Sequence, residues 1–164
     1  MRRVLPLIAV AGVAGIAGVA AYVILDGSSS HAAPQPPEAF MSRVLELTVD
    51  ERYDEAWTFL HPGHQQLVPR QRFVRCRESD PTIAGYRFVS ASFVSKRYVP
   101  IESPGIPQHT STEVVLRFRI AERTSGRTLP AEEATVRAVW IDRRWAWVIP
   151  ERELPTFRAG RCPS

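Results

Sequence analysis

Residues 113–121 read EVVLRFRIA, and this stretch decides the fold of the chain. Apolar side chains alternate along it with arginines: Val114, Leu116, Phe118 and Ile120 fall on one side, Arg117 and Arg119 on the other. A period of two is typical of a β-strand with one buried face, because successive side chains of a strand point to opposite faces. We therefore predict a strand here, in a sheet that is covered on one side.

The chain after this strand predicts a turn and two further strands. Thr124-Ser125-Gly126 has the composition of a turn. Residues 135–141 and 144–149 are apolar and aromatic, and only Asp142-Arg143 separates them. So short a connection predicts a tight hairpin. Three of the four tryptophans lie in it: Trp140, Trp145 and Trp147.

The chain before this strand predicts one more strand and a loop. Residues 86–99 are rich in β-branched and aromatic residues, which favour strands. Residues 100–108 contain three prolines and one glycine, and we expect a loop there. The four strands should form an antiparallel meander.

Further upstream, the apolar residues recur with the period of a helix. Residues 39–48 fit a helix with one buried face, and a second helix is expected over 51–60. Thr48 and Glu51 have the spacing of a capping box, and Asp50 is a competing cap. The stripe of the second helix lies at positions i, i+3, i+4 and i+7: Tyr53, Ala56, Trp57 and Leu60.

Prolines mark the limits of a third helix. Pro62-Gly63 is expected to break the chain, Pro69 to begin the helix, and Asp80-Pro81 to close it. Three helices followed by four strands predict an α+β fold, with the helices packed on one face of a curved antiparallel sheet.

The first residues predict a membrane segment. Met1-Arg2-Arg3 precedes 22 uncharged residues, 4–25, enough for one helix to span a bilayer with its N-terminus in the cytoplasm. This signal-anchor would tie the chain to the membrane. The alternative is a signal peptide, with secretion after cleavage at the small-residue site Ser30-His31-Ala32.

Residues 26–37 read DGSSSHAAPQPP and predict a linker, which leaves 38–164 as an extracytoplasmic domain. We expect no nucleic-acid partner, because the arginines that give the net charge of +4 are dispersed among acidic residues. Cys76 and Cys162 are expected to form a disulfide in an oxidising compartment and to tether the C-terminal tail; the alternative is one buried and one free thiol.

Three segments carry a resemblance to a known family: residues 55–62 (EAWTFLHP), 72–76 (RFVRC) and 142–148 (DRRWAWV). Together they resemble the nuclear transport factor 2-like, or cystatin-like, superfamily, and more narrowly its small envelope-anchored actinobacterial members. The resemblance covers about residues 38–150 and implies a cone of helices on a curved sheet. The superfamily hosts isomerases, dehydratases, epoxide hydrolases and non-catalytic binders, so it selects no activity.

No set of residues predicts catalysis, a cofactor or a metal site. His61 and His64 lie three apart, but zinc needs a third ligand and His61 is expected to end a helix. Glu113 is expected to start a strand, and the other carboxylates considered lie at strand ends, turns or loops: Asp80, Glu132, Glu133 and Asp142. None falls at an inward position flanked by apolar residues, where a general acid or base would be tuned.

Six aromatic residues are candidates to line a cavity between helices and sheet, or to fill it: Tyr53, Trp57, Phe73, Tyr86, Phe118 and Trp140. We therefore expect a non-enzymatic, membrane-tethered binding or accessory domain, whose partner is an envelope protein or a small apolar ligand. The alternative is a small isomerase, dehydratase or hydrolase of the same superfamily, with a carboxylate acid/base in the cone.

Overall fold

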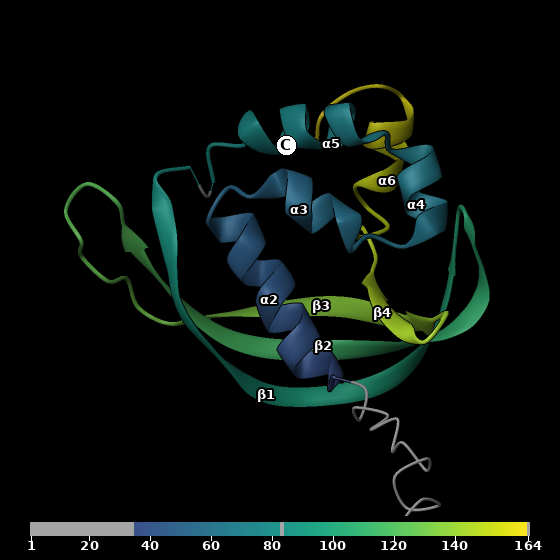
Figure 1. Ribbon diagram of the computed structural model, residues 1–164, viewed down its shortest axis with the longest axis horizontal. Coiled ribbons are helices and arrows are strands. Elements are labelled where there is room, and N and C mark those ends of the chain that lie inside the picture. The colour runs from purple at the N-terminus through teal and green to yellow at the C-terminus, as the bar shows by residue number, and fades with distance from the viewer. Residues whose placement is uncertain (1–34, 83, 164) are drawn as a thin grey trace, which may run out of the picture. The chain divides into compact units, whose positions relative to one another are not determined.

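The computed structural model describes residues 35–82 and 84–163 (Figure 1). The predicted membrane segment 4–25 and the cleavage site at 30–32 lie outside these residues. Among the helices that are described, none has both the length and the apolar character needed to cross a bilayer.

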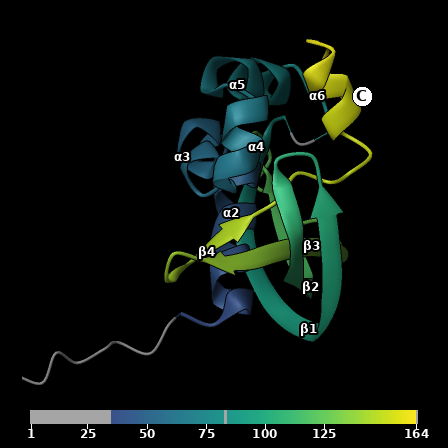
Figure 2. The ribbon, with the colours of Figure 1, turned by 90° about the vertical axis from the view of Figure 1, so that its right-hand side faces the viewer.

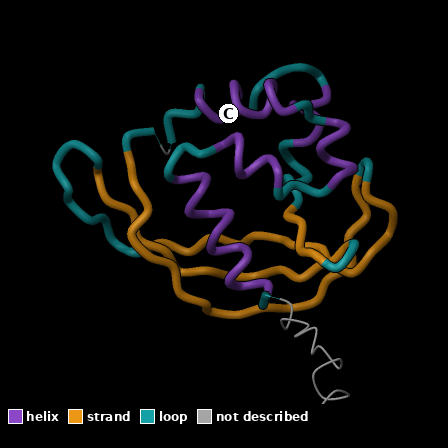
Figure 3. The backbone as a smooth tube through the Cα atoms, in the orientation of Figure 1, coloured by secondary structure: helices purple, strands orange, loops and turns teal. Residues whose placement is uncertain are grey.

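The sheet is a four-stranded antiparallel meander in the order β1-β2-β3-β4, which confirms the predicted topology. The strands are β1 Tyr86–Ser103, β2 Ile106–Glu122, β3 Glu132–Ile141 and β4 Arg144–Trp147. They curve strongly and form a cup (Figures 1 and 3). Val114 and Leu116 of the alternating stretch are fully buried, whereas Arg117 is exposed, so the period of two identified the covered face correctly.

The predicted loop over 100–108 is wrong. β1 and β2 run through it and turn only around Pro104-Gly105, so that Ile101 and Ile106 are buried. Prolines are tolerated on strands with a free edge, where the missing N–H need not remove a ladder bond. Pro100 lies on the outer strand β1, and Pro107 lies where β2 has not yet met β3.

In the described residues, five helices lie on the concave side of the sheet (Figures 1 and 2). They are α2 Pro37–Val49, α3 Tyr53–Thr58, α4 Pro62–Leu67, α5 Arg70–Glu78 and α6 Leu154–Arg158. α2 crosses the concave face of the sheet, and the others stack above it (Figures 1 and 2). The arrangement is α+β, as predicted, but α4 and α6 were not expected. The main core joins both layers and includes Phe40, Met41, Val44, Phe73, Val114, Leu116, Trp147, Ile149 and Phe157.

The predicted capping box at the start of α3 is also wrong. The Thr48 hydroxyl donates to the Val44 carbonyl at 2.8 Å, and Glu51 adopts a positive φ of 62°. Asp50 ends α2, and its carboxylate accepts a hydrogen bond from the Phe88 N–H at 2.8 Å. The chain turns sharply between α2 and α3. Thr48 and Asp50 therefore stabilise this turn, and Asp50 also binds the start of β1.

Pro62-Gly63 begins a helix where a break was predicted. Pro62 occupies the first turn of α4, where a missing N–H costs nothing. His61 is therefore the N-cap of α4 and does not end the preceding helix; its Nδ1 accepts a hydrogen bond from the Gly63 N–H at 3.1 Å. α5 ends before Asp80-Pro81, as predicted, but it begins at Arg70, and Pro69 is its N-cap and not its first residue.

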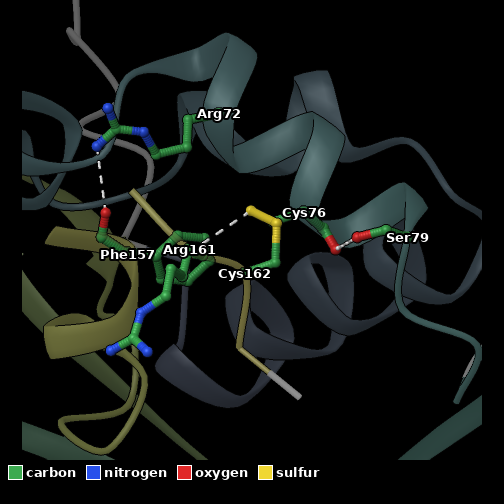
Figure 4. The surroundings of a disulfide bond; sticks show 6 residues. All are labelled: Arg72, Cys76, Ser79, Phe157, Arg161 and Cys162. Atoms are coloured by element: carbon green, nitrogen blue, oxygen red, sulfur yellow. Dashed lines mark hydrogen bonds between the residues drawn. A yellow bond between two sulfur atoms is a disulfide. The ribbon is translucent and has the colours of Figure 1, made fainter. Parts of the chain in front are cut away.

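The predicted hairpin turn and the predicted disulfide are both present. Asp142 and Arg143 have φ values of 49° and 61°, as a two-residue hairpin turn with matching twist requires. Cys76 and Cys162 form a disulfide with their Cα atoms 4.9 Å apart (Figure 4). It ties the C-terminal tail to α5, where Arg72 also donates to the Phe157 carbonyl at 3.1 Å. The alternative with a free thiol is thus wrong.

Candidate functional site

A cavity of about 810 Å³ opens beside β3. α2 contributes its apolar residues Met41, Val44 and Leu45, and the end of β4 with the segment that follows it contributes Trp147, Val148 and Ile149. Residues 133–137 of β3 line the cavity without interruption. Since alternate side chains of a strand point to opposite faces, a cavity that touches five consecutive residues lies along the edge of the strand.

The edge is open because β4 is short. β4 pairs with β3 only from Ala138 to Ile141, and one further hydrogen bond joins the Val148 N–H to the Arg137 carbonyl at 3.2 Å. The chain then leaves β3 toward α6. The sequence predicted this strand to continue to residue 149. The cavity therefore occupies part of the space beside β3 that a longer β4 would have filled.

Glu113 is the one buried carboxylate among the residues that line the cavity. The sequence predicted it at the start of a strand, which is wrong. It lies within β2, 6% exposed, beside Arg97 of β1 and Arg137 of β3. Arg97 Nε donates to one carboxylate oxygen at 2.6 Å and Arg137 Nε to the other at 3.1 Å. These hydrogen bonds lower the pKa of Glu113, and the bond from Arg97 has the largest effect. The group is therefore a charged ion-pair partner at neutral pH.

The other three carboxylates that line the cavity are paired with arginines as well. Glu153 accepts from Arg77 at 2.7 Å, Glu133 from Arg117 at 2.7 Å, and Glu151 lies 3.7 Å from Arg137. The Arg77 guanidinium also stacks over the ring of Phe73, with its central carbon 5.4 Å from the ring centroid. The cavity thus has an apolar floor, and each acid that lines it lies within 4.0 Å of an arginine nitrogen.

The two histidines lie outside the cavity and serve the backbone. His64 is fully buried; its Nδ1 accepts from the Ile149 N–H at 3.1 Å, and its Nε2 lies 3.3 Å from the Ser103 hydroxyl. Burial lowers the pKa of His64 to about 4 and also lowers that of His61. Within residues 35–82 and 84–163, no three His, Cys, Asp or Glu side chains converge as a metal site requires.

The six predicted cavity residues lie elsewhere. Tyr53 and Phe73 are buried in the main core, where burial raises the pKa of Tyr53. Trp57, Tyr86 and Phe118 are half-buried outside the cavity. Trp140 lines a smaller hollow of about 370 Å³, where its ring packs edge-to-face against that of Trp145.

The residues that do line the cavity carry a weak sequence signal. Met41 and Val44 belong to the predicted apolar stripe of α2, and Trp147 was noted in the hairpin. Their grouping around β3 depends on where β4 leaves the sheet, which periodicity does not reveal.

Comparison of the chain with protein-family models, with curated proteins and with solved structures finds no match. The resemblance to nuclear transport factor 2-like proteins therefore stays a prediction.

Proposed function

We propose that the chain is a membrane-tethered extracytoplasmic domain that binds a partner in the cavity beside β3 and performs no reaction there. The observation that carries this proposal is the combination of an apolar floor with four arginine-paired carboxylates. A cavity of this size and character is typical of binding sites.

The enzymatic alternative requires a carboxylate whose pKa is tuned near the working pH, usually by an apolar wall. Here the arginines move the pKa of Glu113 in the opposite direction. The carboxylate is consequently a poor general acid and a weak base, which favours binding over catalysis.

The tether and the fold family belong to the same proposal. Residues 4–25 would anchor the chain in the membrane, and the Cys76–Cys162 disulfide supports an oxidising compartment beyond it. Helices on the concave side of a curved four-stranded sheet support a cone of the nuclear transport factor 2-like type.

Photocrosslinking in living cells of the native host tests the proposal. A benzophenone amino acid replaces Leu45, which is half-buried on the cavity wall; the matched control replaces Tyr98, which is 71% exposed on β1. We expect a specific adduct from position 45 and none from position 98, with the adduct identified by mass spectrometry. If position 45 captures nothing under conditions where the protein is folded and oxidised, the cavity is not a binding site in the cell.

A further inference from the structure

We propose that the occupant of the cavity is an extended polypeptide segment that adds to the outer edge of β3 as a fifth strand. This inference rests on the proposed function and names the class of partner. It excludes a small apolar ligand as the natural occupant.

The first argument is the direction of the backbone groups. The Arg137 carbonyl points outward, that is, away from β2, because it accepts a hydrogen bond from the Val148 N–H on the side of β3 opposite to β2. The N–H and C=O groups of a strand residue point to the same side and alternate along the strand, so those of Thr135 and Glu133 also point outward. Among the described strands, none pairs with β3 there.

The chain itself stops the pairing at this point. Continuing the register by two residues from Arg137 and Val148 would place residue 150 opposite Thr135. Residue 150 is proline, which has no N–H to donate to the Thr135 carbonyl. Pro150 therefore ends the pairing of this segment with β3. A regular stretch of the β3 edge, about 13 Å long over 133–137, is left open to another strand.

The long outer edge of the sheet, on β1, is protected against such pairing. β1 contains three register shifts, and it carries Lys96 and Arg97 near its middle. Bulges and charges are the usual protection of an edge strand. The pairing of β3 with β2 contains no shift, so β3 presents the flat edge that strand addition needs.

The surroundings define the chemistry of the added strand. On the helix side of the edge lie Met41, Val44 and Val136, which favour apolar side chains at alternate positions. All four carboxylates that line the cavity are already paired with arginine. The lining thus offers no unpaired carboxylate to a basic side chain, while Arg152 lines the cavity without an acidic partner in the described part of the chain. These surroundings favour a segment without basic residues that alternates apolar and small polar side chains. Backbone hydrogen bonds would supply affinity and the alternate pockets specificity.

The test uses the full chain in phosphatidylcholine nanodiscs and, as probe, a phage-displayed library of random linear decapeptides. We expect enriched peptides to alternate apolar and polar residues. Their affinity is then measured by fluorescence anisotropy for the unaltered chain, for Thr135→Pro and for the matched control Thr135→Val. Proline removes the outward N–H, whereas valine keeps it and has nearly the shape of threonine.

We expect Thr135→Pro to weaken binding at least about tenfold and Thr135→Val less than about threefold. Peptides N-methylated at alternate residues should lose binding to the unaltered chain, which keeps the test valid if the proline variant does not fold. Equal affinity for Thr135→Pro and Thr135→Val in the folded state overturns the strand inference. Self-association through this edge in place of peptide binding overturns it as well.

The two proposals fail in different ways. A small molecule captured at position 45 in cells, with no enriched peptide in the library, leaves the binding function standing and removes the strand. No adduct at position 45 removes both.

Discussion

At the scale of single residues, His64 shows how a side chain that suggests metal binding can instead organise the backbone. Its Nδ1 accepts the N–H of Ile149, so the hydrogen of the neutral ring lies on Nε2 and faces the Ser103 hydroxyl. α4, the end of β1 and the segment after β4 are thereby joined at one buried ring. A protonated ring could not accept from Ile149, which adds to the cost of burying its charge.

This arrangement predicts a loss of stability in mild acid. Because the folded pKa of His64 is about 4 and the unfolded one about 6.5, the unfolded chain binds the proton more tightly. The contribution of His64 is present above pH 6.5, is lost as the pH falls toward 4, and changes little below that. We expect the free energy of unfolding to fall by about 3 kcal/mol from this group, measured by urea unfolding at a series of pH values.

The control is His64→Asn, in which the amide oxygen can still accept from Ile149 but does not titrate. Its unfolding free energy should depend less on pH over the same window, by roughly the amount that His64 contributes. A pH dependence equal to that of the unaltered chain would show that another group is responsible.

At the scale of elements, two glycines let α4 touch the turn between β1 and β2. A Cβ atom added to Gly63 would lie 1.7 Å from the Gly105 carbonyl oxygen. Gly105 also has a positive φ of 79°, which the turn requires. The contact fixes the tip of the long β1–β2 hairpin against the helices and brings Ser103 within reach of His64.

Gly63→Ala is therefore expected to destabilise the protein by about 3 kcal/mol, because backbone atoms must move apart. Gly126→Ala gives a reference for backbone strain without crowding, since its φ is 72° and an added Cβ meets no atom within 4 Å. We expect about 1 kcal/mol for this reference, from backbone strain alone. Chemical denaturation gives both values, and a loss below about 1 kcal/mol for Gly63→Ala would mean that the close packing of α4 on the turn is not required.

The elements also show what the sequence could and could not predict. Alternation located β2 and its buried face because it depends only on neighbouring residues, and Asp142-Arg143 located the hairpin for the same reason. α4 was missed because six residues carry little periodicity and Pro62-Gly63 favours a turn as readily as a helix start. The strand content of 100–108 was missed because Pro100 and Pro107 lie on free edges.

At the scale of the whole molecule, the disulfide closes the chain around the core. Cys76 and Cys162 are 86 residues apart, and in the chain-entropy model a loop of this length contributes about 4–5 kcal/mol of stability. The pairing was predictable because only two cysteines are present. It holds α6 and the tail over α5, where Phe157 completes the main core.

The candidate site was not predictable from the sequence. It results from three segments that meet only in the folded molecule: α2 above, the free edge of β3 along one side, and the chain that Pro150 and His64 direct away from β3. Glu113 was misplaced for the same reason, since its arginine partners come from the two neighbouring strands. Pro150 is visible in the sequence, but its consequence depends on the register of β3 and β4.

Hydrogen exchange of the full chain, resolved to single amides, tests most directly that the edge of β3 is the binding site. In the free protein the amides of Glu133 and Thr135 should exchange fast, while those of Ala134 and Val136, which face β2, exchange slowly. Adding a saturating enriched peptide should slow exchange at Glu133 and Thr135 by about tenfold or more. Unchanged exchange at both residues while the peptide is bound, or new protection along β1 instead, would contradict the account.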